Sequence, residues 1–205
     1  MKKHIIIFFL NISISSCGGA KYSYNFEKGK NINFESGKWI LNEPFTNYKD
    51  NDAYKYAKVE FEEILGDSLV ELIKLRQTKI IEKKLPLNPT TNELSQIKKF
   101  SGSNFLINIE SKIEKNQMGS SSHHTPDFGT AIKYNEAWTK IRIYDLDKLE
   151  LISESTAFGQ VKVTKRSEDD ESVLEGLLDY TTPGKKLALK TIEKLIRKYD
   201  KYRQE

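Results

Sequence analysis

The chain has 205 residues, and 38% of them are hydrophobic, which is sufficient for one hydrophobic core of single-domain size. Basic and acidic residues number 33 and 29, for a formal net charge of +4, and the two signs are interspersed. This balance excludes the strongly basic footprint of a nucleic-acid-binding protein. The single cysteine excludes a disulfide within the chain.

The first residues form a basic, then apolar, then small-residue segment. Lys2 and Lys3 precede the apolar run Ile5–Leu10, and Ile14–Cys17 is followed by Gly18. The apolar run is much shorter than the roughly 20 residues of a membrane-spanning helix. The segment resembles a bacterial lipoprotein signal, with Ser16 in place of the usual Gly or Ala.

This resemblance implies that residues 1–16 are a signal peptide and that Cys17 carries the fatty chains, palmitate among them. Gly18 favours the outer membrane over retention at the inner one, with the domain in the periplasm or exposed at the cell surface. A secretory peptide cleaved elsewhere and an uncleaved anchor are the alternatives. We expect residues 17–37, which are polar and contain glycine, to form a lipidated flexible tether.

Aromatic residues alternate within this tether at Tyr22, Tyr24 and Phe26. Alternation is typical of a strand that packs on its own domain, and a docking strip for another molecule is the alternative. We expect the folded domain to span residues 38–203.

The first half of the domain alternates strand and helix signals. Residues 38–45 predict a strand that ends at Pro44, and residues 52–74 predict a long helix. Gly66 interrupts this helix at a cost of about 1 kcal/mol relative to Ala, and Ser68 with Glu71 has the spacing of a capping box that restarts it. A short strand is expected over residues 78–82.

The central segment has clear start and stop signals. Thr90 and Glu93 have capping-box spacing, and the short helix they begin is expected to end near Ser101–Gly102. Residues 104–113 predict a strand with apolar side chains on both faces, which indicates a strand covered on both sides.

The second half predicts a hairpin and a final helix. Residues 117–135 form a polar insertion, residues 137–146 and 150–158 form the hairpin, and residues 160–164 extend it or start another strand. A charged loop over 166–172 follows. Thr182–Pro183 favours a helix start, and its apolar stripe comprises Leu189, Ile192, Leu195, Ile196 and Tyr199.

Few side chains have the pattern of a catalytic or metal site. His123 and His124, with Asp127 nearby, can bind a transition metal, but no cysteine completes a tetrahedral set and a solvated loop is the simpler interpretation. Asp145 and Asp147 can act as an acid–base pair, but turns also favour aspartate.

Two further features have an ordinary structural interpretation beside a functional one. Residues 168–171 are acidic but lack the spacing of a calcium loop. Trp39 and Trp138 lie in predicted strands, where we expect core residues, and an interface anchor is the alternative for either.

The order of elements resembles a family of envelope domains. The family includes the curli-export pore lipoprotein, the penicillin-binding-protein activator lipoproteins and the amino-terminal domain of the Tol-system propeller protein. The likeness is carried by Leu94–Ile97 with Gly102–Ile107, and by Ile141–Leu146 with Leu151–Ser155. It implies an α/β fold without an active site.

We therefore expect an α/β domain in which a single mixed sheet of about five strands is packed by two to three helices. The expected function is a non-catalytic, membrane-anchored lipoprotein that binds another cell-envelope protein in envelope assembly or wall synthesis. No cofactor or metal is expected. The alternative is an oligomeric component of an outer-membrane export complex, although the polar insertion at 117–135 lacks the alternation of a membrane-crossing hairpin. A small-ligand or hydrolytic role is a third possibility.

Overall fold

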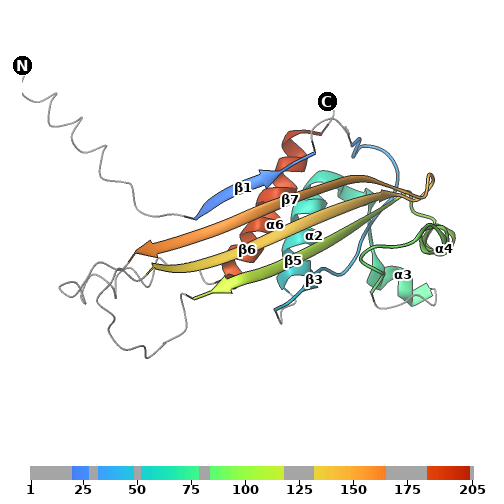
Figure 1. Cartoon of the computed structure of the whole chain (residues 1–205). Coiled ribbons are helices and arrows are strands. Elements are labelled where there is room, and N and C mark those ends of the chain that lie inside the picture. The colour runs from blue at the N-terminus through green and yellow to red at the C-terminus, as the bar shows by residue number, and fades with distance from the viewer. Residues whose placement is uncertain are drawn as a thin grey trace, which may run out of the picture.

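Three long antiparallel strands dominate the computed structural model, and helices lie behind them and at one end (Figure 1). The structure describes residues 20–27, 32–48, 52–78, 84–117, 132–164 and 184–203. The strands are β1 (Lys21–Asn25), β2 (Trp39–Leu41), β3 (Phe45–Thr46), β4 (Leu69–Glu71), β5 (Phe105–Asn116), β6 (Ile132–Asp145) and β7 (Glu150–Thr164). The helices are α2 (Asp52–Leu65), the 3₁₀ turn η1 (Gly66–Ser68), α3 (Leu72–Thr78), α4 (Thr91–Ser101) and α6 (Gly184–Lys201).

The sheet is mixed and has the order β1-β7-β6-β5-β2-β4, with β3 paired to β5. β1, β7, β6 and β5 are antiparallel neighbours, whereas β2 is parallel to both β5 and β4. The predicted α/β class and single mixed sheet are confirmed. The predicted count of about five strands is wrong, because the sheet has seven. The structure also has four α-helices among the described residues, where two to three were expected.

The amino-terminal aromatic segment belongs to the sheet. Lys21–Asn25 pairs along its whole length with β7, from Lys21 opposite Gln160 to Asn25 opposite Thr156. Phe34 is 3% exposed and lies in the core. The expectation of a flexible tether is therefore wrong for these residues, and the alternation of Tyr22 and Tyr24 marks an edge strand.

The predicted helix over 52–74 is interrupted by a strand. α2 ends at Leu65, and Gly66 takes a φ of +52°, a conformation that glycine adopts without strain. The next residues form β4, which pairs in parallel with β2, and the helix resumes only at Leu72. The prediction that the helix restarts at Ser68 is wrong, because Leu69–Glu71 pair with β2 as a strand of the sheet. Of the strand expected over 78–82, Thr78 is instead the last residue of α3, and the rest lies outside the described residues.

The predicted boundaries of α4 are confirmed. The Thr90 side chain accepts a hydrogen bond from the backbone N–H of Glu93, and the Glu93 carboxylate accepts one from the backbone N–H of Thr90. Gly102 ends the helix in the left-handed region, and its N–H donates to the Lys98 carbonyl. β7 continues to Thr164, which confirms that residues 160–164 extend the hairpin strand, whereas β6 begins earlier than predicted, at Ile132 within the expected insertion.

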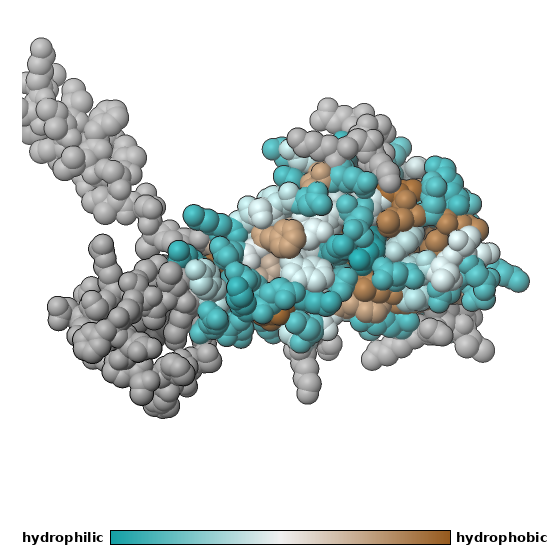
Figure 2. Space-filling model, in the orientation of Figure 1, coloured by the Kyte–Doolittle hydropathy of each residue, from teal (hydrophilic) through white to brown (hydrophobic). Residues whose placement is uncertain are grey.

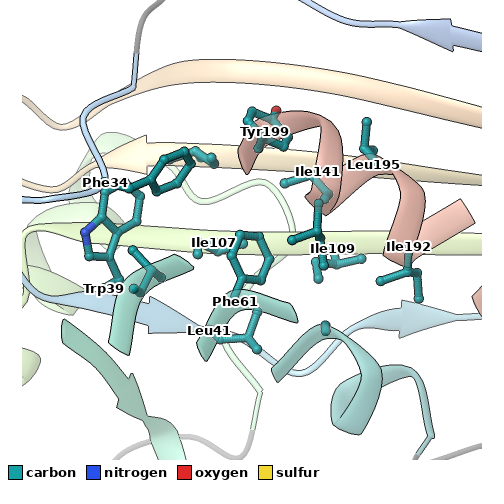
Figure 3. Packing of buried hydrophobic residues seen from close by; sticks show 14 of the residues in the cluster. Phe34, Trp39, Leu41, Phe61, Ile107, Ile109, Ile141, Ile192, Leu195 and Tyr199 are labelled. Carbon is teal, nitrogen blue, oxygen red and sulfur yellow. The ribbon is translucent and has the colours of Figure 1, made fainter. Parts of the chain in front are cut away.

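The core forms between one face of the sheet and helices α2 and α6 (Figure 3). Ile107, Ile109 and Ile141 from the strands meet Ile192 and Leu195 of α6, and all five are fully buried. The predicted apolar stripe of the last helix is thus confirmed. A smaller cluster fills the opposite face at one end, where Leu106 and Tyr144 meet Leu94 and Ile97 of α4.

α6 lies close to the sheet because a glycine faces it. A Cβ at Gly159 would come within 2.9 Å of the Thr191 methyl carbon and 3.0 Å of Leu187 Cδ1. The Thr191 hydroxyl is 2.7 Å from that of Thr139 on β6, which donates to Ser111 on β5. This buried chain of hydroxyls links the helix to the two central strands.

Candidate functional site

Several predicted site residues lie outside the described part of the chain. They are Cys17, His123, His124, Asp127 and the acidic segment 168–171. The lipidation of Cys17 therefore stays a prediction. Among the residues that the structure describes, no group of three or more His, Cys, Asp or Glu can hold a metal ion. The described helices also include none with the length and apolar character needed to cross a bilayer.

The two aspartates of the hairpin have separate structural roles. Asp145 Oδ1 accepts hydrogen bonds from the backbone N–H groups of Asp147 and Lys148, both at 2.9 Å. Asp147 points away, accepts a hydrogen bond from Asn104 and forms an ion pair with Lys98 on α4. This arrangement closes the turn and ties it to α4, as expected for turn aspartates.

The two tryptophans have different environments. Trp39 is fully buried and stacks on Phe105 with ring centroids 4.1 Å apart, so its predicted core role is confirmed. Trp138 is only partly buried, and the core prediction is wrong for this residue. Its neighbours Ala137 and Thr139 face α6, and the strict alternation of β6 therefore directs Trp138 to the opposite face.

Trp138 lies at the centre of an open sheet face. The register aligns Ser23, Phe158, Trp138 and Lys112 across four strands, so these four side chains share that face. Phe158 is 48% exposed, although it is a large hydrophobic residue. An open hollow of about 590 Å³ lies around the two aromatic residues and is lined by Trp138, Phe158, Lys21, Tyr22, Ser23, Glu114 and Gln160, among others. We call this surface the Trp138–Phe158 hollow.

The sheet lies in front of α2 and α6 in Figure 1, and Figure 2 shows the same side of the molecule. That side is mainly hydrophilic, with isolated hydrophobic areas enclosed by polar ones. An aromatic centre with a charged rim is typical of protein-binding surfaces.

Charged side chains hold one flank of the hollow in a fixed network. Arg142 donates to Glu154 at 2.8 Å and to Glu110 at 3.2 Å, while Lys112 and Lys140 pair with the same two carboxylates. Partial burial alone would raise the pKa of Glu110 and of Glu154. The hydrogen bonds from the lysines and Arg142 outweigh it and hold both pKa values below their ordinary level.

The other flank is held in the same way. Glu136 accepts a hydrogen bond from Gln160 at 2.7 Å and pairs with Lys115 at 3.0 Å, and these contacts lower the pKa of Glu136. The Trp138 indole N–H donates to Glu114 at 2.6 Å, and the Lys112 ammonium lies 5.2 Å from the indole ring centroid. The indole is therefore fixed in orientation before any partner binds.

Sequence reasoning missed Phe158 and assigned Trp138 to the core. The available signal was the alternation of the hairpin. A turn at 147–148 pairs Trp138 with a residue near 158, and placing Ile141 and Ile143 on the buried face leaves both aromatics on the other. The general expectation that tryptophan is buried outweighed that signal.

Comparison with known proteins shows low similarity. No family model and no curated protein matches the chain. Among solved structures, the chain is similar to the PelC dodecamer from Paraburkholderia phytofirmans, with 10% identity over 90% of this chain and 100% of that one and a TM-score of 0.42.

It is also similar to lipoprotein GNA1162 from Neisseria meningitidis, with 8% identity over 71% of this chain and 94% of that one and a TM-score of 0.36. The similarity to E. coli LpoB has 8% identity over 63% of this chain and 57% of that one, with a TM-score of 0.35. At these values the function of a neighbour is not transferred to this chain.

Proposed function

We propose that this chain is a non-catalytic lipoprotein, anchored to the outer membrane through Cys17, whose domain binds another cell-envelope protein at the Trp138–Phe158 hollow. The observation that carries the binding role is an aromatic pair, the exposed Phe158 and the partly exposed Trp138, on a sheet whose charged rim is fixed by ion pairs. The leader sequence supports the anchor.

The geometry favours a protein partner over a small molecule. The hollow is open, and its floor is a sheet whose side chains are already paired with one another. Small-molecule sites are concave and enclose most of the ligand, whereas protein interfaces are flatter and rely on a few aromatic anchors. Trp138 and Phe158 are placed as such anchors.

Site-specific photocrosslinking in cells tests the binding role. A photoreactive amino acid at Phe158 is expected to yield one defined adduct with an envelope protein. The same reagent at Val59, which is 54% exposed on α2, is the matched control and is expected to yield none. Equal adducts at both positions, or none at Phe158, would contradict the proposed surface. Adducts only with a second copy of the chain, together with a ring-sized particle by light scattering, would instead support an oligomeric export component.

Mass spectrometry of the mature amino terminus tests the anchor independently. We expect an acylated peptide that begins at Cys17, and we expect it to disappear in Cys17→Ala. An unmodified amino terminus elsewhere in the chain would overturn the anchor without affecting the binding surface.

A further inference from the structure

Positive charge is concentrated on the last helix. Residues 184–203 contain eight basic and two acidic residues, so the rest of the chain has 25 basic and 27 acidic residues and is slightly acidic. Arg197 on this helix points to α2, where it binds Glu60 through two hydrogen bonds of 2.9 and 3.1 Å. Lys194 and Lys198 contact a different element, the edge strand β1.

Tyrosines of β1 support these lysines. The Lys194 ammonium lies 4.7 Å from the ring centroid of Tyr22, and that of Lys198 lies 4.4 Å from Tyr24. At the end of α6, the ammonium groups of Lys198 and Lys201 both lie within 6 Å of the ring centroid of Tyr202, which is 44% exposed. We call this surface the Tyr–Lys strip: Tyr22, Tyr24, Lys194, Lys198, Lys201 and Tyr202.

We propose that the Tyr–Lys strip docks onto the anionic headgroup surface of the membrane that holds the lipid anchor. Tyrosine is enriched where its ring meets headgroups, and lysine stems lie along apolar surface while their charges reach outward. Lysines near a bilayer are attracted by anionic lipids. The strip combines both side-chain types along one edge of the domain.

Chain length brings this edge to the membrane. The inference rests on the proposed acylation of Cys17, because only three residues separate Cys17 from the first residue of β1. Even fully extended, four residue steps reach at most about 14 Å. Because this length is an upper bound, the first residue of β1 lies at most about two Debye lengths from Cys17, and the strip that begins beside it at Tyr22 lies near the membrane surface.

The strip and the hollow meet at Tyr22, which contacts Lys194 of the strip and also lines the hollow. Tyr22 and Tyr24 point to α6, whereas Ser23 between them points to the open face and lines the hollow. Docking through the strip would hold the domain by its β1–α6 edge and leave Trp138 and Phe158, on β6 and β7, available to a partner.

Lysine labelling tests the proposal on the mature lipidated protein. The protein is added to preformed vesicles of phosphatidylcholine alone or of phosphatidylcholine with phosphatidylglycerol. A membrane-impermeant amine-acylating reagent is then applied, and labelled sites are quantified by mass spectrometry. We expect Lys194, Lys198 and Lys201 to react at least about fivefold more slowly on the anionic vesicles. The attraction of one lysine to such a surface strengthens binding about fivefold. Lys112 and Lys140 on the open face are internal controls and are expected to react equally on both.

A charge-removal pair sharpens the test. Lys194→Gln with Lys198→Gln is expected to abolish the protection of Lys201, whereas Lys112→Gln with Lys140→Gln is expected to preserve it. Equal labelling of the strip on both vesicles overturns the proposal, and so does protection that persists without anionic lipid because a co-purifying protein covers the strip. The intact mass of the amino-terminal peptide is read in the same sample. An acylated chain with an unprotected strip would refute docking alone, and a protected strip on an unacylated chain would refute the anchor alone.

Discussion

Ile141 and Lys140 are neighbours on β6, yet their side chains lie in opposite environments. Ile141 is fully buried among the aliphatic side chains of β5 and α6, while Lys140 reaches Glu154 on the open face at 2.8 Å. The same alternation runs along all three long strands. Away from the end that α4 covers, one face therefore carries the folding energy of the sheet, and the other is free to vary in chemistry without unfolding the domain.

The covered face is expected to give the largest loss of stability. Ile141→Ala removes three buried carbons and leaves a cavity beneath α6, which lowers the free energy of unfolding by about 3 kcal/mol. Urea denaturation followed by circular dichroism measures the change. Lys140→Ala, one residue away, is the control and is expected to cost less than about 1 kcal/mol. Equal losses would contradict the division between the two faces.

The close approach of α6 to the sheet gives the next effect. Gly159→Ala places a methyl group 2.9 Å from Thr191 Cγ2 and is expected to destabilise the fold by about 2 kcal/mol. Thr191→Ser removes that methyl carbon and keeps the hydroxyl that bonds Thr139. The double variant is therefore expected to recover part of the loss in a double-mutant cycle. If the stability losses of the two single variants are additive, Leu187 rather than Thr191 sets the distance between α6 and β7.

The charged network of the open face is expected to contribute less, and in a pH-dependent way. Arg142→Met is expected to lower the free energy of unfolding at pH 7 by about 1 kcal/mol. Because the pKa values of Glu110 and Glu154 are depressed from 4.5 in the folded protein, this stabilisation is present above pH 4.5 and is lost as the pH falls through the folded values.

The difference between wild type and Arg142→Met should therefore shrink as the pH falls below 4.5. Unfolding curves across that range measure it. Lys148→Met removes an exposed partner of Asp145 at 3.5 Å and serves as the control, with little effect at any pH. A constant difference across the range would show that Arg142 acts through packing alone.

The sequence predicted correctly those helices whose ends are determined by residues close to them in the chain. The Thr90–Glu93 capping box, Gly102 and the apolar stripe of α6 each depend on residues within one or two helical turns. β4 was not predicted as a strand, and β1 was only one of the interpretations of its alternating aromatic residues, because their pairing partners are distant in the chain. Lys21 faces Gln160, and Leu69 faces Trp39. A three-residue strand inside a helical pattern has no local signature, since only its parallel neighbour stabilises it.

The candidate site was hidden for a related reason. Trp138 and Phe158 meet only through the register of β6 with β7, and their shared exposure depends on which face α6 covers. Apolar periodicity identifies that a face is buried, but the identity of the covering helix is a property of the whole fold. The network of Arg142 with Glu110 and Glu154 likewise joins three strands and has no sequence motif.

Phe158→Ala is expected to have the smallest effect on stability and the largest on binding. The side chain is 48% exposed, so its removal should change the free energy of unfolding by less than about 0.5 kcal/mol. If Phe158 is an interface anchor, however, its truncation should weaken capture of the partner by about 2 kcal/mol, or roughly thirtyfold. Val59→Ala on α2 removes a comparably exposed hydrophobic side chain and should leave capture unchanged. Unfolding and capture are measured on the same variants. A loss of binding with unchanged stability assigns Phe158 to partner recognition, whereas a loss of both would show that Phe158 has a structural role.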